Sequence, residues 1–491
     1  MTTTTSPILL LLLLVSCRPS TESVSPGFKT RITSEGLTYA NNVALDVLSK
    51  AIIGVSVPDQ SGSASIVTYH LTGIHITEFN KPTSQVTLNP NGVYWSGSNA
   101  VLQIHGNWAY HTLFISDSGN FDFSATGVSF HEDIALSADT NGRPHIKASG
   151  CGVGIGGVSI TFHGGASAIY NLFSSIVANE IKSALTGQIC GIVTNLINTN
   201  AENALAKLPV TVDIANTFLL DYSMDEQPMF QKTFLESYHK GEFDWKSAPA
   251  PPPFQAPPLP AWNDTSRMMY VWASDYMVNS LLYQGQTHKF FAYNLTAQDL
   301  PAANRSALNT TCHTLLCIGN LIPQLQKSYP NCQVDLHMRS ASVPAVAVTP
   351  QDVIGNASGI IDFYARPVTG SYYGNRFYKY SVRNTPAYLF TLNVSMSTAA
   401  DVHVKNETIF GKLRDVKFGV KVVKTAIQDI HDKALQFIID IALNTVVIPK
   451  INSIGEKGLE LPTIEGVHFV NPSVMLMQRT LLVSTDLKYA P

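Results

Sequence analysis

The stretch APAPPPFQAPPLP, from Ala248 to Pro260, constrains the chain most, because it divides 491 residues into two halves of similar length. Its seven prolines fix the backbone φ angle and remove hydrogen-bond donors, so it forms neither a helix nor a central strand. We interpret it as an extended, semi-rigid connector of polyproline type. The alternative is a ligand for a partner domain with an aromatic groove. Such partners are mostly cytosolic, whereas the start of this chain points outside the cell.

The beginning of the chain has the pattern of a secretory leader. Residues 7–15, PILLLLLLV, form an apolar run that is too short to span a bilayer. This run predicts a signal peptide within residues 1–25, and therefore a secreted, extracellular protein. The first six residues contain no Lys or Arg, and Leu14-Val-Ser-Cys17 can be mistaken for a bacterial lipoprotein box. No later run is expected to cross a membrane, because the best one, 434–448, carries Asp440.

Composition describes a folded protein with little charged surface. Apolar residues make up 45% of the chain and charged residues 14%, which excludes general disorder. The length allows two to four domains, and the central connector favours two.

Secretion makes disulfide bonds possible, and the cysteines divide between the halves. Cys151 and Cys190 are alone in the first half, and we expect them to pair, which on the loop-entropy model stabilises the fold by roughly 4 kcal/mol. Cys312, Cys317 and Cys332 cannot all pair within one chain, and their spacing does not predict a zinc site. One of these three thiols is left over or pairs between chains.

Glycosylation sequons of the Asn-x-Ser/Thr type occur only after the connector. If they are used, they coat the second half with sugar and leave the first half bare. The candidate sites are Asn263, Asn294, Asn304, Asn309, Asn356, Asn393 and Asn406.

In the first half, the spacing at which apolar residues recur changes twice along the chain. Apolar residues recur every three or four positions from Ser34 to Gly54, which predicts an amphipathic helix that Gly54 ends. A period of two follows from 65 to 162, with turn signals between the runs, and predicts antiparallel strands in a strongly curved sheet. From Ile169 to Ile197 a broad apolar stripe predicts a long helix. This stripe is wider than one sheet face needs, so it could line an apolar cavity, although plain core packing is the competing interpretation.

The second half repeats this plan. Alternation from Met268 to Tyr276 predicts a strand, and a short helix is expected over 317–327. More alternating runs precede a second long apolar helix, predicted from Val422 to about Ile451. Because both long helices are followed by Leu-Pro and a β-prone segment, we interpret the halves as duplicates of one α+β unit.

Short markers spread over nearly the whole chain resemble those of a known family. The chain resembles the secreted lipid-binding proteins typified by bactericidal/permeability-increasing protein and lipopolysaccharide-binding protein, a family that also includes phospholipid transfer proteins. The markers are Pro26-Gly27, Arg31-Ile32, Gly36-Leu37-x-Tyr39-Ala40, Ser118-Gly119-Asn120-Phe121, Cys151, Cys190, Lys240-Gly241-Glu242-Phe243, Ser274-Asp275-Tyr276, Asn279-Ser280, Lys457-Gly458 and Leu461-Pro462.

The resemblance implies an α+β fold: an elongated boomerang of two similar barrels, each a curved antiparallel sheet wrapped around a long helix. It implies an N-terminal barrel over 26–208, a central sheet with the Pro-rich linker over 209–262, and a C-terminal barrel over 263–491. Each barrel of the family has an apolar pocket for phospholipid acyl chains. The corresponding candidates here are Leu48, Ile52, Leu172, Phe173, Ile176, Ile430, Leu435 and Ile438.

No motif in the chain calls for enzyme chemistry. Gly152-x-Gly154-x-x-Gly157 matches a dinucleotide fingerprint only formally, because a strand-like run follows it where a helix should begin. The fourteen histidines are scattered, with no His-x-x-x-His pair, and there is no Gly-x-Ser-x-Gly elbow. We therefore expect no catalytic activity, no cofactor and no metal.

Three hypotheses of function follow. The resemblance favours an innate-defence protein whose partners are phospholipid, lipopolysaccharide and the bacterial outer-membrane surface, without nucleic acid. The second hypothesis is an extracellular phospholipid carrier or transfer protein that has no bacterial role. The third, an extracellular hydrolase, rests on secretion alone.

The tip of the first barrel distinguishes this chain from the family's defence members, which carry clusters of Lys and Arg there. The matching stretch, Gly106 to Phe121, has neither residue. Residues 27–245 contain 10 basic and 18 acidic residues, a net charge of −8, and residues 246–491 contain 21 and 16, a net charge of +5. We expect contact with a lipid surface through Trp108, Tyr110, Leu113 and Phe114 instead. The alternative is that some of these side chains face the core.

Overall fold

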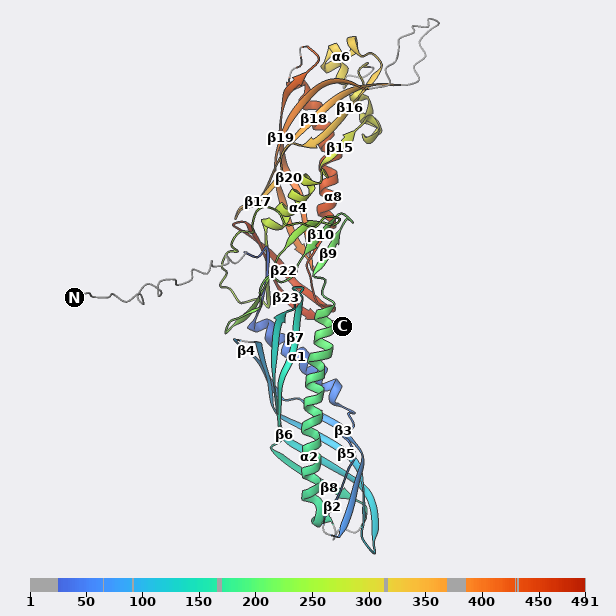
Figure 1. Ribbon diagram of the computed structural model, residues 1–491, viewed down its shortest axis with the longest axis vertical. Coiled ribbons are helices and arrows are strands. Elements are labelled where there is room, and N and C mark those ends of the chain that lie inside the picture. The colour runs from blue at the N-terminus through green and yellow to red at the C-terminus, as the bar shows by residue number, and fades with distance from the viewer. Residues whose placement is uncertain are drawn as a thin grey trace, which may run out of the picture.

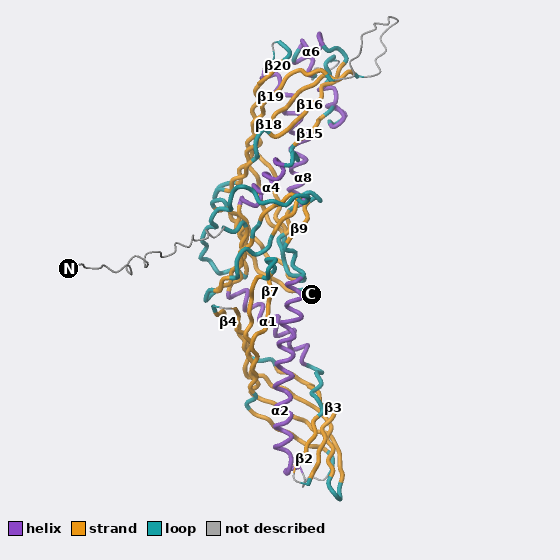
Figure 2. The backbone as a smooth tube through the Cα atoms, viewed as in Figure 1, coloured by secondary structure: helices purple, strands orange, loops and turns teal. Residues whose placement is uncertain are grey.

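The computed structural model describes residues 25–64, 66–90, 92–165, 170–312, 317–368, 386–428, 430 and 432–490. The predicted signal peptide lies outside these residues. Figure 1 shows an elongated molecule with a curved sheet at each end and another sheet between them. Among the described residues, the paired strands of the two end sheets are antiparallel, and a long helix runs beside each sheet (Figure 2). The predicted fold class is therefore confirmed.

The first barrel is a seven-stranded sheet in the order β2-β3-β5-β6-β7, with β4 on β5 and β8 on β6. Long alternating runs form its central strands, as the period of two predicts. The strands are β2 Gln60–Ala64, β3 Val67–Asn80, β4 Thr83–Asn89, β5 Gly92–His111, β6 Ser116–Ala138, β7 Pro144–Gly154 and β8 Gly157–His163.

Two helices pack against this sheet. Helix α1, Ser34–Ile52, begins where the Thr33 hydroxyl accepts a hydrogen bond from the Gly36 amide at 3.4 Å. It ends just before Gly54, whose φ is +81°, a left-handed value that suits glycine. Helix α2, Tyr170–Asn195, continues through a π-helical turn, Leu196–Ala201, into α3, Glu202–Ala206. Both predicted helices of the first half are thus present.

The second barrel has a seven-stranded sheet in the order β15-β16-β18-β19-β20-β21, with β17 on β18. Its strands are β15 Ala292–Leu295, β16 Cys332–Ser340, β17 Ala345–Val348, β18 Val353–Pro367, β19 Ala387–Lys405, β20 Thr408–Thr425 and β21 Leu459–Glu460. Short 3₁₀ helices, Ala297–Asp299 and Ala302–Leu308, follow β15.

The second long helix differs from its prediction at both ends and in continuity. The predicted start at Val422 is wrong, because strand β20 extends to Thr425 and its alternating Phe418, Val420 and Val422 pack against the core. The helix consists of α7, Asp432–Ala442, a π-helical turn, Leu443–Val447, and α8, Ile448–Lys457. The wide π turn lets the helix pass Pro449, which occupies the first turn of α8, where a missing amide costs little.

Two shorter predictions also need correction. The helix expected over 317–327 is split into α5, Ile318–Leu321, and α6, Pro323–Ser328, because Pro323 begins a new helix. The strand expected to reach Tyr276 ends earlier, as β14, Met269–Ser274. Tyr276 lies instead in α4, Asp275–Thr287, a helix that the alternating pattern concealed.

The central sheet joins the halves with strands from distant parts of the chain, in the order β11-β12-β1-β14-β23-β22. A smaller sheet, β13-β10-β9, lies nearby. The strands are β1 Phe28–Thr33, β9 Thr211–Ile214, β10 Phe218–Asp221, β11 Met229–Phe230, β12 Phe234–His239, β13 Glu242–Trp245, β14 Met269–Ser274, β22 Val467–Met477 and β23 Thr480–Tyr489.

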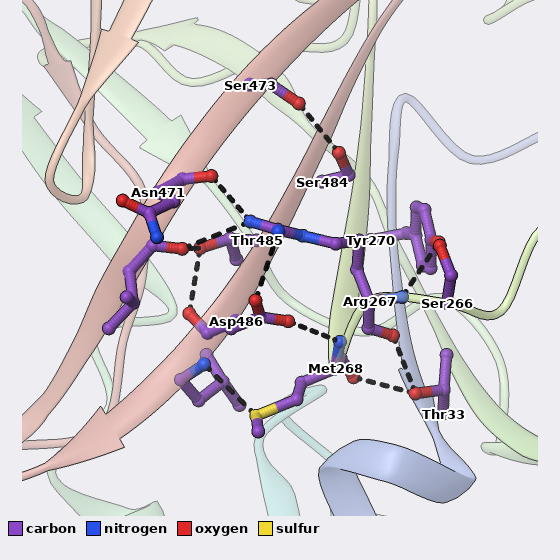
Figure 3. A network of polar contacts seen from close by, with 12 residues as sticks. Thr33, Ser266, Arg267, Met268, Tyr270, Asn471, Ser473, Ser484, Thr485 and Asp486 are labelled. Carbon is purple, nitrogen blue, oxygen red and sulfur yellow. Dashed lines mark hydrogen bonds and ion pairs between the residues drawn. The ribbon is translucent and has the colours of Figure 1, made fainter.

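Specific hydrogen bonds hold the end of the Pro-rich linker on this sheet. The indole of Trp272 donates to the Pro260 carbonyl at 3.1 Å, and the Arg31 guanidinium donates to the Trp262 carbonyl at 2.6 Å. Farther on, Arg267 donates to the Asn471 carbonyl at 2.6 Å and pairs with Asp486 at 3.1 Å (Figure 3). The end of the linker is thus fixed to β1 and β14, and the segment that follows it is fixed to β22 and β23.

The structure shows which cysteines are paired. Cys151 and Cys190 are bonded and tie β7 to α2, as predicted. Cys312 and Cys317 form a second bond, which the sequence left open, and Cys332 is the free cysteine among the residues that the structure describes.

Candidate lipid-binding site

The predicted pocket residues of the first barrel fall into three groups. Leu48 and Ile52 are each 1% exposed and belong to the core cluster between α1, α2 and the sheet. Ile176 is 37% exposed, beside the buried Val177 on α2. Leu172 and Phe173 lie on α2, but their side chains are outside the described part of the structure.

In the second barrel, all three predicted residues contact the apolar core. Leu435 and Ile438 of α7 are 0% and 1% exposed. Ile430 precedes that helix and packs, half-buried, against the same cluster. The structure therefore brings Leu48 and Ile52 into one apolar interior and these three residues into the other. Their contact with lipid stays a prediction.

Near its C-terminal end, the long helix of the second barrel has a short apolar face that the protein does not cover. Residues 435–457 form a helix that is long and apolar enough to cross a membrane by length and composition, contrary to our expectation from sequence. Only 28% of its most apolar window is buried. Ile451 is 37% exposed and Ile454 is 66% exposed, one helical turn apart.

Local packing fixes α8 against β20 and leaves those isoleucines outside. A Cβ on Gly455 would lie 2.1 Å from the Gly411 carbonyl oxygen, so only glycine permits this approach. The Asn452 side chain accepts a hydrogen bond from the Leu413 amide at 2.8 Å. The sequence has apolar residues on both sides of this helix. That pattern is equally typical of a helix that is packed in a core, so it did not predict the exposed isoleucines.

The tip of the first barrel divides the four predicted contact residues into two pairs. Trp108 and Tyr110 are each 2% exposed, and their rings stack in the core with centroids 5.8 Å apart. The prediction of lipid contact is therefore wrong for this pair. They continue the inward positions of Leu102 and Ile104 along β5, because every second residue of a strand points to the same face.

The other pair is fully outside. Leu113 is 84% exposed and Phe114 is 93% exposed, in the turn between β5 and β6. Ile115, 55% exposed, extends this apolar turn. Ile66, 73% exposed, lies in the turn between β2 and β3, and the pairing of Thr68 with His111 places the two turns at the same end. Ile66 and Ile115 were not among the contact residues predicted from the sequence.

A separate groove of about 490 Å³ lies on the second barrel, over β17 to β20. Small polar side chains, including Ser342, Ser358 and Ser395, line it together with the sequon residue Asn356. None of the predicted pocket residues lines this groove.

The sequon asparagines differ in their exposure. Asn304 and Asn309 are half-buried, and the Asn309 side chain accepts a hydrogen bond from Gln333 at 3.3 Å. The exposed ones are Asn263, Asn294, Asn356, Asn393 and Asn406. These five are open to modification, while glycosylation itself stays a prediction.

Comparison with known proteins identifies the family. The N-terminal domain model of the LBP / BPI / CETP family matches residues 36–200, and its C-terminal domain model matches residues 212–489. The chain belongs to this family. The resemblance drawn from short markers is therefore confirmed.

Individual relatives match over the full length. The chain is 29% identical to bactericidal permeability-increasing protein of Sebastes schlegelii, covering 97% of this chain and 98% of that protein. It is 25% identical to lipopolysaccharide-binding protein of Bos taurus, covering 99% and 98%. A crystal structure of lipopolysaccharide binding protein superposes with a TM-score of 0.66 at 23% identity, covering 95% of this chain and 100% of that one. This likeness shows a shared fold.

Proposed function

We propose that this protein is a secreted lipid-binding protein of innate defence, which binds the acyl chains of phospholipid and of bacterial lipopolysaccharide. The proposed binding units are the barrels of residues 26–208 and 263–491, joined by the central sheet and linker of residues 209–262. Membership of the family over both units supports the proposal, as do relatives named for lipopolysaccharide binding and bactericidal action.

The uncovered apolar face of the second barrel's helix carries the structural part of the proposal. Ile451 and Ile454 leave hydrocarbon surface in contact with water near the end of this helix, whereas the exposed Gln436 and Asp440 of α7 are polar. Each methylene group removed from water contributes about 0.8 kcal/mol, so an acyl chain lying along Ile451 and Ile454 would be stabilised and would cover that surface. No catalytic group is needed for this function.

The second candidate is an extracellular phospholipid carrier or transfer protein with no bacterial role. It is favoured by the charge of the first half, −8, and by the lack of Lys and Arg in residues 106–121. A protein that seeks an anionic bacterial surface gains from positive charge, which this end lacks at neutral pH.

Native mass spectrometry of the purified protein tests lipid binding directly. We expect co-purifying phospholipid, and we expect Ile451→Gln/Ile454→Gln to lower the amount bound, because the substitution makes the uncovered face polar without creating a glycosylation sequon. Val423→Gln is the matched control, since Val423 is also exposed, at 55%, but lies on β20 of the same barrel. Wild-type protein without lipid but with ester-hydrolysing activity would contradict the proposal and favour a hydrolase.

Binding of purified lipopolysaccharide separates the two candidates. The defence hypothesis expects lipopolysaccharide to displace the phospholipid. A carrier without a bacterial role is expected to keep its phospholipid in the same assay.

A further inference from the structure

Histidines that are scattered in the sequence lie together on the outer face of the first barrel. His75 of β3 pairs in register with His105 of β5, which pairs with Asp122 of β6. Asp122 accepts hydrogen bonds from His105 Nδ1 and from His163 Nε2, both at 2.9 Å. The His75 and His105 ring centroids are 5.8 Å apart. We call His75, His105 and His163, with Asp122, the histidine row.

The row faces solvent, because its neighbours along the strands face the core. Ile74, Ile104 and Phe123 are at most 1% exposed. The side chains of His105 and His163 are 39% and 48% exposed. A ligand approaching the outside of the barrel therefore meets these rings directly.

The charge of this end of the barrel depends on the histidines. Residues 59–78, 103–126 and 157–165 contain five histidines, three aspartates and one glutamate, and no Lys or Arg. The glutamate, Glu78, is exposed and pairs in register with Gln103, two residues from His105. The aspartates are Asp59, Asp117 and Asp122, and the histidines outside the row are His70 and His111. Helix α2, on the inner side of the sheet, contributes Glu180 and Lys182, which offset each other. Full protonation of the five rings changes the formal charge of these segments from −4 to +1.

The Asp122 carboxyl stays ionised in mildly acidic solution. Hydrogen bonds from His105 and then His163 lower the pKa of the Asp122 carboxyl below its ordinary value. The carboxylate therefore remains an acceptor for both rings as the pH falls. Imidazole is the side chain that ordinarily gains a proton between pH 7 and pH 5.

We infer that the histidine row is an acid-activated site for the phosphate groups of an anionic lipid surface. This inference rests on the proposed lipid-binding function and adds a condition under which the first barrel binds a membrane. The occupant is a lipid surface because the exposed turn of Leu113 and Phe114 lies at the same end, and His111, the last residue of β5, directly precedes that turn. The described residues hold no cluster arranged for a metal ion.

Electrostatics sets the size of the effect. A basic residue near an anionic lipid surface contributes on the order of 1 kcal/mol, so protonation of a few rings strengthens binding by roughly tenfold or more. Salt screens this contribution, because the Debye length falls to about 3 Å at 1 M ionic strength. The acid gain should therefore disappear in concentrated salt.

Co-sedimentation of the full protein with vesicles tests the inference. Vesicles of phosphatidylcholine with phosphatidylglycerol are compared with vesicles of phosphatidylcholine alone, at about pH 7.5 and about pH 5.5, on either side of the imidazole range. We expect binding to the anionic vesicles to rise about tenfold at the lower pH in dilute salt. Binding to neutral vesicles should change little.

Two triple variants locate the effect. His75→Gln/His105→Gln/His163→Gln should lose most of the acid gain and keep its binding at pH 7.5. The control, His131→Gln/His403→Gln/His468→Gln, removes three exposed histidines elsewhere and should keep the gain. Circular dichroism checks that each protein is folded at both pH values. If the first triple variant is not folded, the single variants His75→Gln and His163→Gln replace it and should each lose part of the gain.

The remaining outcomes separate the inference from the proposed function. Equal binding of wild-type protein at both pH values, or an equal acid gain on neutral vesicles, overturns the histidine site and leaves the acyl-chain proposal standing. An acid gain that survives in the histidine-row variants also overturns it. Absence of co-purifying lipid in native mass spectrometry, together with no vesicle binding at either pH, overturns the proposed function itself.

Discussion

The two barrels share one plan and differ in their surfaces. The first half has a net charge of −8, no sequon and an exposed apolar turn at its tip, whereas the second half has a net charge of +5 and seven sequons. Both long helices contain a π-helical turn, after α2 in the first barrel and between α7 and α8 in the second. The two barrels thus share one architecture, while each has a surface suited to a separate contact.

The difference suggests how the two ends divide their roles. Sugar on the second barrel would keep that end in water, and the bare first barrel can approach a lipid surface. The apolar face of α8 in the second barrel is then suited to a carried acyl chain.

The disulfides should show the largest difference between the barrels. Cys151 and Cys190 are separated by 39 residues, and Cys312 and Cys317 by 5. On the loop-entropy model, replacing the first pair by serine should lower the free energy of unfolding by about 4 kcal/mol, and replacing the second by about 2 kcal/mol. Urea unfolding of the two double variants measures this. Equal losses would show that loop length does not set their contributions.

Acid should weaken the central sheet between the barrels by lowering its free energy of unfolding, whereas acid should strengthen vesicle binding by the histidine row. Burial lowers the pKa of His239 in β12 to about 4, and its two nitrogens contact the Tyr222 carbonyl and the Ser237 hydroxyl, both at 2.8 Å. The unfolded chain binds this proton near pH 6.5, so the stabilisation is complete above that pH and is lost as the pH falls toward 4. The maximum loss is about 3 kcal/mol.

Urea unfolding at neutral and acid pH checks this prediction. His239→Gln should flatten the pH dependence between about pH 6.5 and about pH 4, because the amide does not titrate there. The exposed His403→Gln is the control and should leave the dependence unchanged. If the acid loss persists in His239→Gln, another group is responsible for it.

Sequence patterns predicted the elements more reliably than their relations to one another. The helices over 34–54 and 169–197 and the Cys151–Cys190 bond were predictable, because local period and an isolated pair of cysteines determine them. The histidine row was not, since it depends on register between β3, β5 and β6. Bulges between Thr72 and His75 and between Ile76 and Glu78 shift that register, and no local pattern marks them.

The tip prediction was partly wrong because aromatic residues near a turn suit either a core or an interface. Strand parity decides between the two: Trp108 and Tyr110 share the inward face of β5 with Leu102 and Ile104. This alternation of faces ends with the strand, and Leu113 and Phe114, in the turn that follows, point into solvent. A count of positions from the buried centre of the strand would have separated the pairs.

The smallest predicted effect tests the lipid contact of that turn. Phe114→Ala should weaken binding to phosphatidylcholine vesicles at neutral pH by roughly tenfold, because burying a Phe side chain contributes about 1.5–3 kcal/mol. Val343→Ala, an exposed position of the second barrel at 41%, is the matched control and should bind like the wild type. Trp108→Ala should instead lower the free energy of unfolding, since its ring lies in the core. Binding that resists Phe114→Ala, or that falls equally with Val343→Ala, would remove the distinction between the two barrel surfaces at neutral pH.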